Sequence, residues 1–411
     1  MQPTGGRAQT TGFATPAGRG EGRGTLLAAL AWTLLCLLLV GPGGCARYFR
    51  LSREDRLRGA ALRDAFHIIP LHHADEVDRD RLYEAAMRAM VESLGDKYSA
   101  HLSPAHAQAR AAEMEGAYTG IGVSLWPTDG FPLVVEVVEG GPAWRADIRP
   151  GDFIVSINGL ETKGRFINEV RAAAFWQAGA DVHLEVLRPA GAQTLTHTLA
   201  LETIPFPKVQ WEMPADGIGL ITVPCFKVGT ASQFAEALDA LQAEGLRALI
   251  LDLRDNGGGL LIETLKLCDM LLDEGLIVRT RSRHPEYQAL YEPSEEVAVP
   301  RTVPIAVLVN GRSASAAEVV AGTLQANGRA TIIGTRTWGK GSGTGLRHLP
   351  DGSALVLTVW RAELAGGKTI EGEGVEPDVV VGSLPPPPDR PEGQDVYGWL
   401  ERNRESRQEQ L

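Results

Sequence analysis

The chain has 411 residues, of which 44% are hydrophobic and 22% charged, so it is neither wholly disordered nor a membrane protein of many spans. This length predicts two or three domains. A net charge of -11 argues against a basic nucleic-acid-binding surface, and four cysteines are too few for a disulfide scaffold.

Residues 1–46 are interpreted as a targeting segment that precedes the folded body. Residues 1–24 have no periodicity and predict disorder, whereas residues 25–40 are strongly apolar. A helix over the uncharged stretch 24–46 would be roughly 33 Å long, enough to cross a bilayer, and it has no polar face suited to a buried core helix. The arginines before it predict that the rest of the chain lies across the membrane. A cleaved signal peptide, a retained transmembrane anchor and lipidation at Cys45 stay open, and each places the body in the cell envelope, periplasmic or otherwise extracytoplasmic.

Residues 47–115 predict an N-terminal helical region. Within it, apolar side chains recur at every fourth position and define one helix face: Leu82, Ala86, Met90 and Leu94. Ser103 followed by Pro104 predicts the start of another helix, with the serine as N-cap and the proline in the first turn.

Residues 116–204 predict a small, mostly antiparallel β domain. Short apolar stretches that predict strands alternate with glycine turns, at 123–126, 133–138, 153–157, 182–187 and 194–201. Asn158-Gly159 is a strong hairpin signal, and a helix is expected over 166–177.

Residues 205–384 predict an α/β region, in which strands alternate with helices. The expected strands are 219–223, 248–254, 304–310 and 330–334, and the expected helices are 232–245, 261–272 and 315–328. This order predicts a largely parallel sheet with helices over its faces. A hairpin at Asp351-Gly352 leads into a last strand over 354–364, and residues 385–411 predict a polar tail.

Three segments with chemical groups follow strands of this region, where open sheets place their sites. Residues 252–261 contain three glycines before a helix, which suits either an anion-binding loop or a plain turn. Ser313 and Ser315 begin the next helix, as a reactive hydroxyl or as a helix cap. Lys340 lies among glycines with few acidic residues close in sequence, as an amine of lowered pKa or as a solvated loop lysine.

Together, a serine, a lysine and a glycine anion pocket are the parts of a Ser–Lys hydrolase. Residues 334–340 also fit GxxxxGK, but Gly341 stands where a phosphate loop needs Ser or Thr, so nucleotide binding is not expected. His67, His72 and His73 lie in the helical region, and HExxH is absent, so we expect no metal site and no cofactor.

The motifs of the chain resemble those of the carboxyl-terminal processing peptidases, or tail-specific proteases, over residues 65–384. In chain order they are LGDKYSAHLSP at 94–104, GAYTGIGVSL at 116–125, GGPAWRADIRPGDFIVSINGLET at 140–162, LRDNGGG at 253–259, SASAAE at 313–318, TWGKG at 337–341 and GEGVEPD at 372–378. The resemblance implies a multidomain protein of the α/β and α+β classes. Its parts would be an N-terminal helical segment (47–115), a β-barrel-like PDZ domain (116–204) and an α/β protease core with a mostly parallel sheet (205–384).

The resemblance also implies roles for individual residues. Ser315 matches the nucleophile and Lys340 the general base of the family, and the oxyanion hole corresponds to Gly258, Gly259 and the N–H of Ala316. Glu318 and Thr337 match supporting positions. Two positions depart from the pattern: Thr344 replaces a glutamine that orients the lysine in many members, and Ala326 replaces an aspartate of some bacterial members. These departures are expected to affect the rate and not the reaction class.

The PDZ resemblance implies a peptide-binding groove. The loop and first strand residues Gly120, Ile121, Gly122 and Val123 would bind a substrate's free C-terminus by main-chain pairing. The expected function is thus an envelope serine endopeptidase whose partners are protein or peptide substrates and, through its N-terminus, the membrane. The alternative is a catalytically silent PDZ-bearing binding or scaffold protein. Nucleic acid is not an expected partner, and a homo-oligomer stays open.

Overall fold

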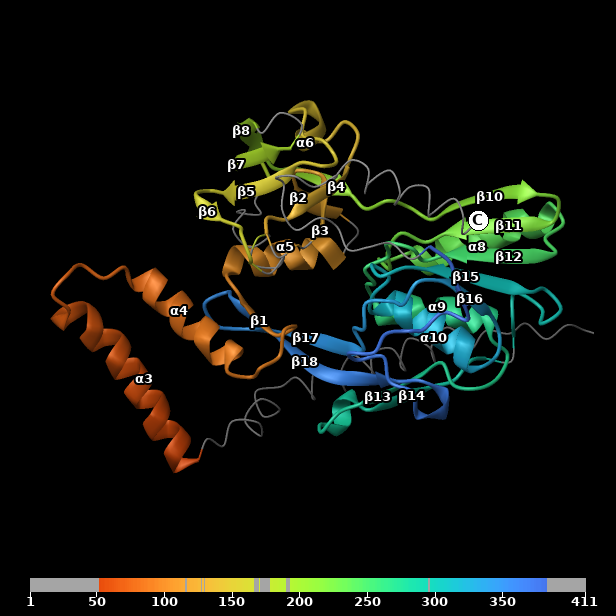
Figure 1. Cartoon of the computed structure of the whole chain (residues 1–411). Coiled ribbons are helices and arrows are strands. Elements are labelled where there is room, and N and C mark those ends of the chain that lie inside the picture. Colours follow the sequence, from red (N-terminus) through yellow and green to blue (C-terminus); the bar gives the residue numbers. More distant parts are fainter. Residues whose placement is uncertain are drawn as a thin grey trace, which may run out of the picture. The chain divides into compact units, whose positions relative to one another are not determined.

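The computed structural model describes residues 52–114, 117–126, 128, 130–165, 170, 178–189, 193–294 and 296–382. These residues form two compact units that divide between Tyr83 and Glu84 (Figure 1). The predicted apolar segment 25–40, Cys45 and the tail 385–411 lie outside the described residues. Among the helices that the structure describes, none has both the length and the apolar character needed to cross a membrane.

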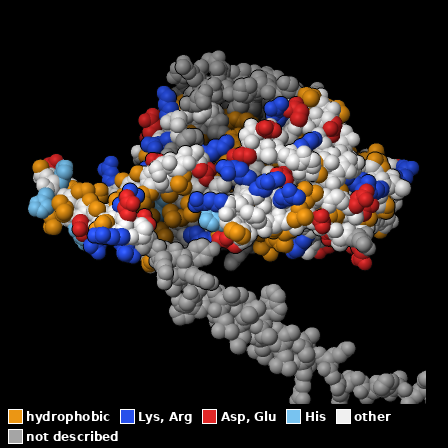
Figure 2. All heavy atoms as spheres, turned by 90° about the horizontal axis from the view of Figure 1, so that it is seen from below, with side chains coloured by type: hydrophobic (Ala, Val, Ile, Leu, Met, Phe, Trp, Pro, Cys, Tyr) orange, Lys and Arg blue, Asp and Glu red, His pale blue; other side chains and the backbone are white. Residues whose placement is uncertain are grey.

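The N-terminal helices are α3 (Arg53–His72) and α4 (Arg79–Glu92). Ser52 caps α3, because its hydroxyl accepts from Asp55 N (3.0 Å) while the Asp55 carboxylate accepts from Ser52 N (3.2 Å). No described residue of α3 is buried, and Figure 2 shows hydrophobic side chains gathered on the surface of these helices.

The apolar face predicted over residues 82–94 is largely exposed in the structure. Met90 and Leu94 are 48% and 58% exposed, whereas Val91 is the buried residue of α4. Apolar spacing identifies a stripe on a helix, but it does not tell whether another element covers that stripe.

The small β domain has the strands that the sequence predicts, all paired antiparallel (Figure 1). One sheet has the order β3-β4-β5-β7-β8, and β6 pairs with β5. The strands are β2 (Ala117–Gly120), β3 (Val123–Trp126), β4 (Leu133–Val137), β5 (Phe153–Ile157), β6 (Leu160–Glu161), β7 (Asp181–Arg188), β8 (Gln193–Ala200) and β9 (Glu202–Pro205), with the short helix α6 (Pro142–Arg145). Asn158 and Gly159 turn the β5–β6 hairpin with φ of 49° and 79°. The predicted helix 166–177 lies outside the described residues except for Val170, which is helical and buried.

The core sheet confirms the predicted βαβ pattern, with the order β10-β11-β12-β15-β16-β19. Its strands are β10 (Gln210–Ala215), β11 (Ile218–Thr222), β12 (Ala248–Asp252), β15 (Ile305–Val309), β16 (Thr331–Gly334) and β19 (Val379–Val380). All neighbours are parallel except β10 and β11. The helices of this region are α8 (Thr230–Ala243), α9 (Leu261–Leu271) and α10 (Ala316–Ala326).

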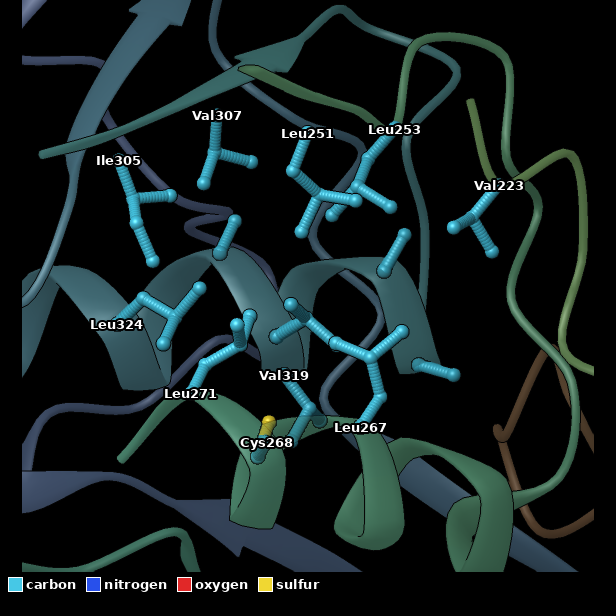
Figure 3. Close-up of a cluster of buried hydrophobic side chains, with 14 of the residues drawn as sticks. Val223, Leu251, Leu253, Leu267, Cys268, Leu271, Ile305, Val307, Val319 and Leu324 are labelled. Atoms are coloured by element: carbon cyan, nitrogen blue, oxygen red, sulfur yellow. The ribbon is translucent and has the colours of Figure 1, made fainter. Parts of the chain in front are cut away.

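Helix α10 lies in the middle of the hydrophobic core. In Figure 3, Leu251 of β12 and Val307 of β15 point toward α10, and Leu267 of α9 points toward it from the other side. Every residue from Ala316 to Leu324 is buried, including the polar Glu318 and Thr323, so the helix is enclosed on all its faces. This burial holds the start of α10 rigidly at the carboxyl edge of the parallel sheet.

A second sheet, which the sequence analysis did not predict, has the order β1-β18-β13-β14, with β17 also paired to β18. Its strands are β1 (Ala100–Leu102), β13 (Val278–Arg281), β14 (Ala289–Tyr291), β17 (Ser342–His348) and β18 (Ala354–Glu363); the short 3-10 helices are Pro285–Tyr287 and Ala365–Gly367. Strand β1 lies in the predicted N-terminal helical region, just before α5 (Pro104–Met114). Three residues carry no strand pattern of their own, and β1 exists because Ala100 and Leu102 pair with β18.

Candidate active site

The turn between β15 and α10 distinguishes the two candidate serines. Ser313 is fully buried, and its hydroxyl donates to Leu253 O (2.7 Å) and accepts from Asn310 N (3.0 Å), so it holds the turn together. Ser315 is half-buried and is the N-cap of α10, with a φ of +56°. A positive φ is unusual for serine, and such strain persists where the surrounding structure enforces it, often at a functional site.

The glycine loop after β12 packs directly against this turn. A Cβ on Gly258 would lie 2.7 Å from Ser315 Cβ and 2.9 Å from Ala316 N, and one on Gly259 would lie 1.9 Å from Phe226 O. Glycine is therefore required at both positions for the two segments to approach. The buried Asn256 fixes the loop, since its amide donates to Val223 O (2.7 Å).

The three expected oxyanion donors differ in whether their N–H groups already have a partner. The N–H of Gly258 donates to Asn256 Oδ1 (2.8 Å), so in this conformation it is not available to a ligand. The N–H groups of Gly259 and Ala316 donate to no acceptor in the described part of the chain. Ala316 is the first residue of α10, where a backbone N–H has no partner within the helix.

Glu318 joins the serine turn to the lysine loop. Its side chain is fully buried, and its Oε2 accepts from both Ser315 N (2.7 Å) and Lys340 N (2.8 Å). Its Oε1 accepts from Gly339 N (2.6 Å) and from the hydroxyl of Thr337 (2.6 Å). One carboxylate therefore brings together two residues that are 25 positions apart in the sequence.

Thr337 extends this arrangement to the segment that carries the GEGVEPD motif. Its hydroxyl accepts from Val375 N (2.7 Å) while it donates to Glu318. Trp338 N donates to Ser313 O (3.0 Å), which ties the lysine loop to the serine turn a second time.

The Lys340 amine has surroundings that lower its pKa. Burial has the largest effect, and the positive charge of Arg110 adds to it, while the carboxylates of Glu371, Asp96 and Glu318 act in the opposite direction. The Nζ atom lies 4.9 Å from the ring centre of Tyr98. The sequence prediction noted few acidic residues near Lys340, but folding brings three from distant segments.

Thr344, the position of the expected lysine-orienting glutamine, lies on β17 beside a bulge and opposite Thr358 of β18. Within the described part of the chain its hydroxyl forms no hydrogen bond to Lys340. The structure thus gives Thr344 no contact that would replace the glutamine side chain.

The predicted peptide-binding residues surround an open sheet edge. Strand β3 is the edge strand of its sheet as described, so its outer side has no strand partner there. The carbonyls of Ile121 and Gly122 accept from Ala143 N (2.9 Å) and Val138 N (2.8 Å), which fixes the position of the loop. Gly122 has a φ of +80°, and Gly120 ends β2 before this loop. Such an edge with a preceding loop can add an extended peptide as a further strand.

Sequence reasoning missed Tyr98, Asn256 and Glu371 as parts of the site. All three lie within or beside motifs that the resemblance identified, which was the available signal. Their closeness to Lys340 or to the glycine loop depends on long-range packing that no local pattern encodes.

Comparison with known proteins agrees with this geometry. The profile of peptidase family S41 matches residues 217–381, and the PDZ domain profile matches residues 133–188. The carboxy-terminal processing protease CtpA of Bacillus subtilis (strain 168) is 31% identical over 355 residues, covering 86% of this chain and 75% of that protein. A probable CtpA-like serine protease of Staphylococcus aureus (strain MSSA476) is 28% identical, covering 87% and 71%.

Among solved structures, the photosystem II D1 C-terminal processing protease superposes with a TM-score of 0.57 at 26% identity, covering 82% of this chain and 95% of that one. These similarities support a protease and not the silent alternative. The chain belongs to peptidase family S41 and is a serine protease of the carboxy-terminal processing type with a PDZ domain.

Proposed function

We propose that Ser315 and Lys340 form the catalytic dyad of this protease. The observation that carries the proposal is the single Glu318 oxygen that accepts from the backbone N–H of both residues. Such a shared anchor fixes the two segments relative to each other, which positions a nucleophile and its base without further ordering on binding.

The chemistry follows from the groups at the site. Ser315 Oγ attacks the peptide carbonyl carbon while its proton passes to the neutral Nζ of Lys340. The oxyanion that forms accepts hydrogen bonds from the N–H groups of Gly259 and Ala316. Lys340 then gives the proton to the departing amine, and water releases the acyl group from Ser315 by the same steps.

The lowered pKa of Lys340 supports its role as the base. An ordinary lysine is protonated at neutral pH and has no lone pair to accept a proton. Burial disfavours the ammonium form and so increases the fraction of neutral amine.

Cleavage of an unfolded protein with an apolar C-terminus tests the dyad. Ser315→Ala and Lys340→Ala should each lower the rate by roughly four to six orders of magnitude with the fold kept. Lys368→Ala removes an exposed loop lysine and is the matched control. Wild-type cleavage by the Ser315 variant would refute the proposal.

We further propose that the PDZ domain binds the free C-terminal carboxylate of substrates. The open edge of β3 and the loop at Ile121 and Gly122 support this function. Matched peptides with a free acid or an amide at the C-terminus distinguish tail binding from other roles. Equal affinity for both would indicate that the groove binds internal peptide sequence, or that the domain only gates the active site.

A location in the cell envelope is also a proposal, supported by the uncharged apolar segment 25–40. Cell fractionation with mass spectrometry of the mature N-terminus tests it. A protein found in the cytoplasm with Met1 intact and no lipid on Cys45 would contradict export.

A further inference from the structure

The amine of Lys340 lies among more charged groups than the dyad itself uses. Three carboxylates act on it from different elements: Glu318 of α10, Asp96 from the segment before β1, and Glu371 from the segment after the second 3-10 helix. Arg110 of α5 opposes them, and the Tyr98 ring covers one side of the amine.

Two of the three carboxylates are already occupied. Glu318 accepts from four donors, and Asp96 accepts from Tyr98 N (3.0 Å) and from the Ser99 hydroxyl (2.5 Å). Glu371 differs, because its Oε2 is buried and has no hydrogen-bond partner among the described residues. A buried carboxylate oxygen without a donor is uncommon and calls for a functional explanation.

The backbone holds Glu371 against the lysine loop. Gly372 N donates to Gly339 O (3.0 Å), on the chain directly before Lys340. Directly after it, a Cβ on Gly341 would lie 2.6 Å from Glu371 N, so glycine there permits the close approach. These backbone contacts therefore hold Glu371 beside Lys340.

We propose that Glu371 is the positioning residue of Lys340 and does the work that a glutamine at position 344 does in the relatives that this chain resembles. The inference rests on the proposed dyad. No carboxylate of the described residues lies within 4.0 Å of Lys340 Nζ at rest, and such contacts often tighten only when substrate binds.

Glu371 acts at the step in which the proton moves from Ser315 to Lys340. When the Ser315 O–H bond breaks and the proton moves to Nζ, a new ammonium forms in a buried place. Glu371 accepts one N–H of that ammonium, which directs the amine and stabilises its charge, as an aspartate does for a catalytic histidine.

The test compares Glu371→Ala and Glu371→Gln with Glu373→Gln, an exposed glutamate two residues away. Both kcat and KM are measured, and kcat/KM is followed against pH. For the alanine variant we expect at least about a tenfold loss of kcat with KM within about twofold, and for the glutamine variant partial recovery. Both variants should move the pH midpoint of kcat/KM lower by about one pH unit, because the ammonium loses a negative neighbour. The Glu373 variant should match the wild type.

Several results would overturn the inference. An unchanged kcat and midpoint in both variants would do so, and so would a loss of kcat with an unmoved midpoint, which indicates a structural role only. If the pH midpoint of kcat/KM moves in Tyr98→Phe but not in Glu371→Gln, the tyrosine hydroxyl and not Glu371 positions the amine. If Lys340→Ala keeps its activity, the dyad itself fails, which is a separate outcome.

Discussion

Replacing Glu318 with glutamine tests whether one carboxylate holds the two halves of the site. The change is nearly isosteric, but it turns one acceptor oxygen into an NH₂ group. If the nitrogen takes the place of Oε2, it faces the N–H groups of Ser315 and Lys340. If it takes the place of Oε1, it faces the N–H of Gly339 and the hydroxyl of Thr337, which is already an acceptor for Val375 N.

Either orientation leaves two donors at a buried site without an acceptor. Each costs about 1–3 kcal/mol, so the free energy of unfolding should fall by about 2–6 kcal/mol, a large share of the roughly 5–15 kcal/mol that stabilises a typical domain. Cleavage should fall by at least about 100-fold, because Ser315 and Lys340 lose their common anchor and small misplacements are costly.

Urea unfolding followed by tryptophan fluorescence, with cleavage assayed on the same samples, measures both effects. Glu236→Gln, an exposed position on α8, is the matched control and should stay within about 0.5 kcal/mol of the wild type. A Glu318 variant as stable and as active as that control would refute the anchoring role.

Three further predictions follow from the geometry. Gly259→Ala would place a Cβ 1.9 Å from Phe226 O at a φ of +150°, so the free energy of unfolding should fall by about 3 kcal/mol or more and cleavage should be lost. A variant as stable as the wild type would contradict this packing. Lys340 must be neutral to accept a proton, and burial lowers its pKa, so activity should rise as the pH increases through that lowered pKa. A flat kcat/KM profile between about pH 5 and 9 would exclude this amine as the base. Gly122→Val forces a β-branched residue to a φ of +80° with its Cβ 3.2 Å from that of Val138. Peptide affinity measured by titration should therefore fall at least about tenfold, or about 1.4 kcal/mol. An unchanged Kd would show that this loop does not bind the peptide.

Much of the fold could be read from local patterns. The strands at 123–126, 153–157 and 305–309 and the helix α9 occur where alternating or continuous apolar residues predict them. Their signals are strong because each element buries its own apolar face, which leaves a regular period in the sequence. Strand β1 has no such period, since three residues paired to a distant strand are too few to show one.

For the candidate site, too, local sequence patterns predicted one part and long-range packing decided the rest. The order of motifs in the sequence was sufficient to select Ser315, Lys340 and the glycine loop as candidates, because strand-to-helix turns rich in glycine and serine are local features. The residues without the family resemblance do not decide between Ser313 and Ser315, whereas the folded turn shows that the Ser313 hydroxyl is already bound to Leu253 O.

The electrostatics of the lysine were decided by tertiary structure alone. Glu318, Asp96 and Glu371 are each more than twenty positions from Lys340 in the sequence, and they act on it only because three separate segments fold around one amine. The same applies to the N–H of Gly258, whose hydrogen bond to Asn256 leaves Gly259 and Ala316 as the available donors. Residue types and their order therefore determine which chemistry is possible, whereas long-range packing determines which atoms are buried, bonded or left free to perform it.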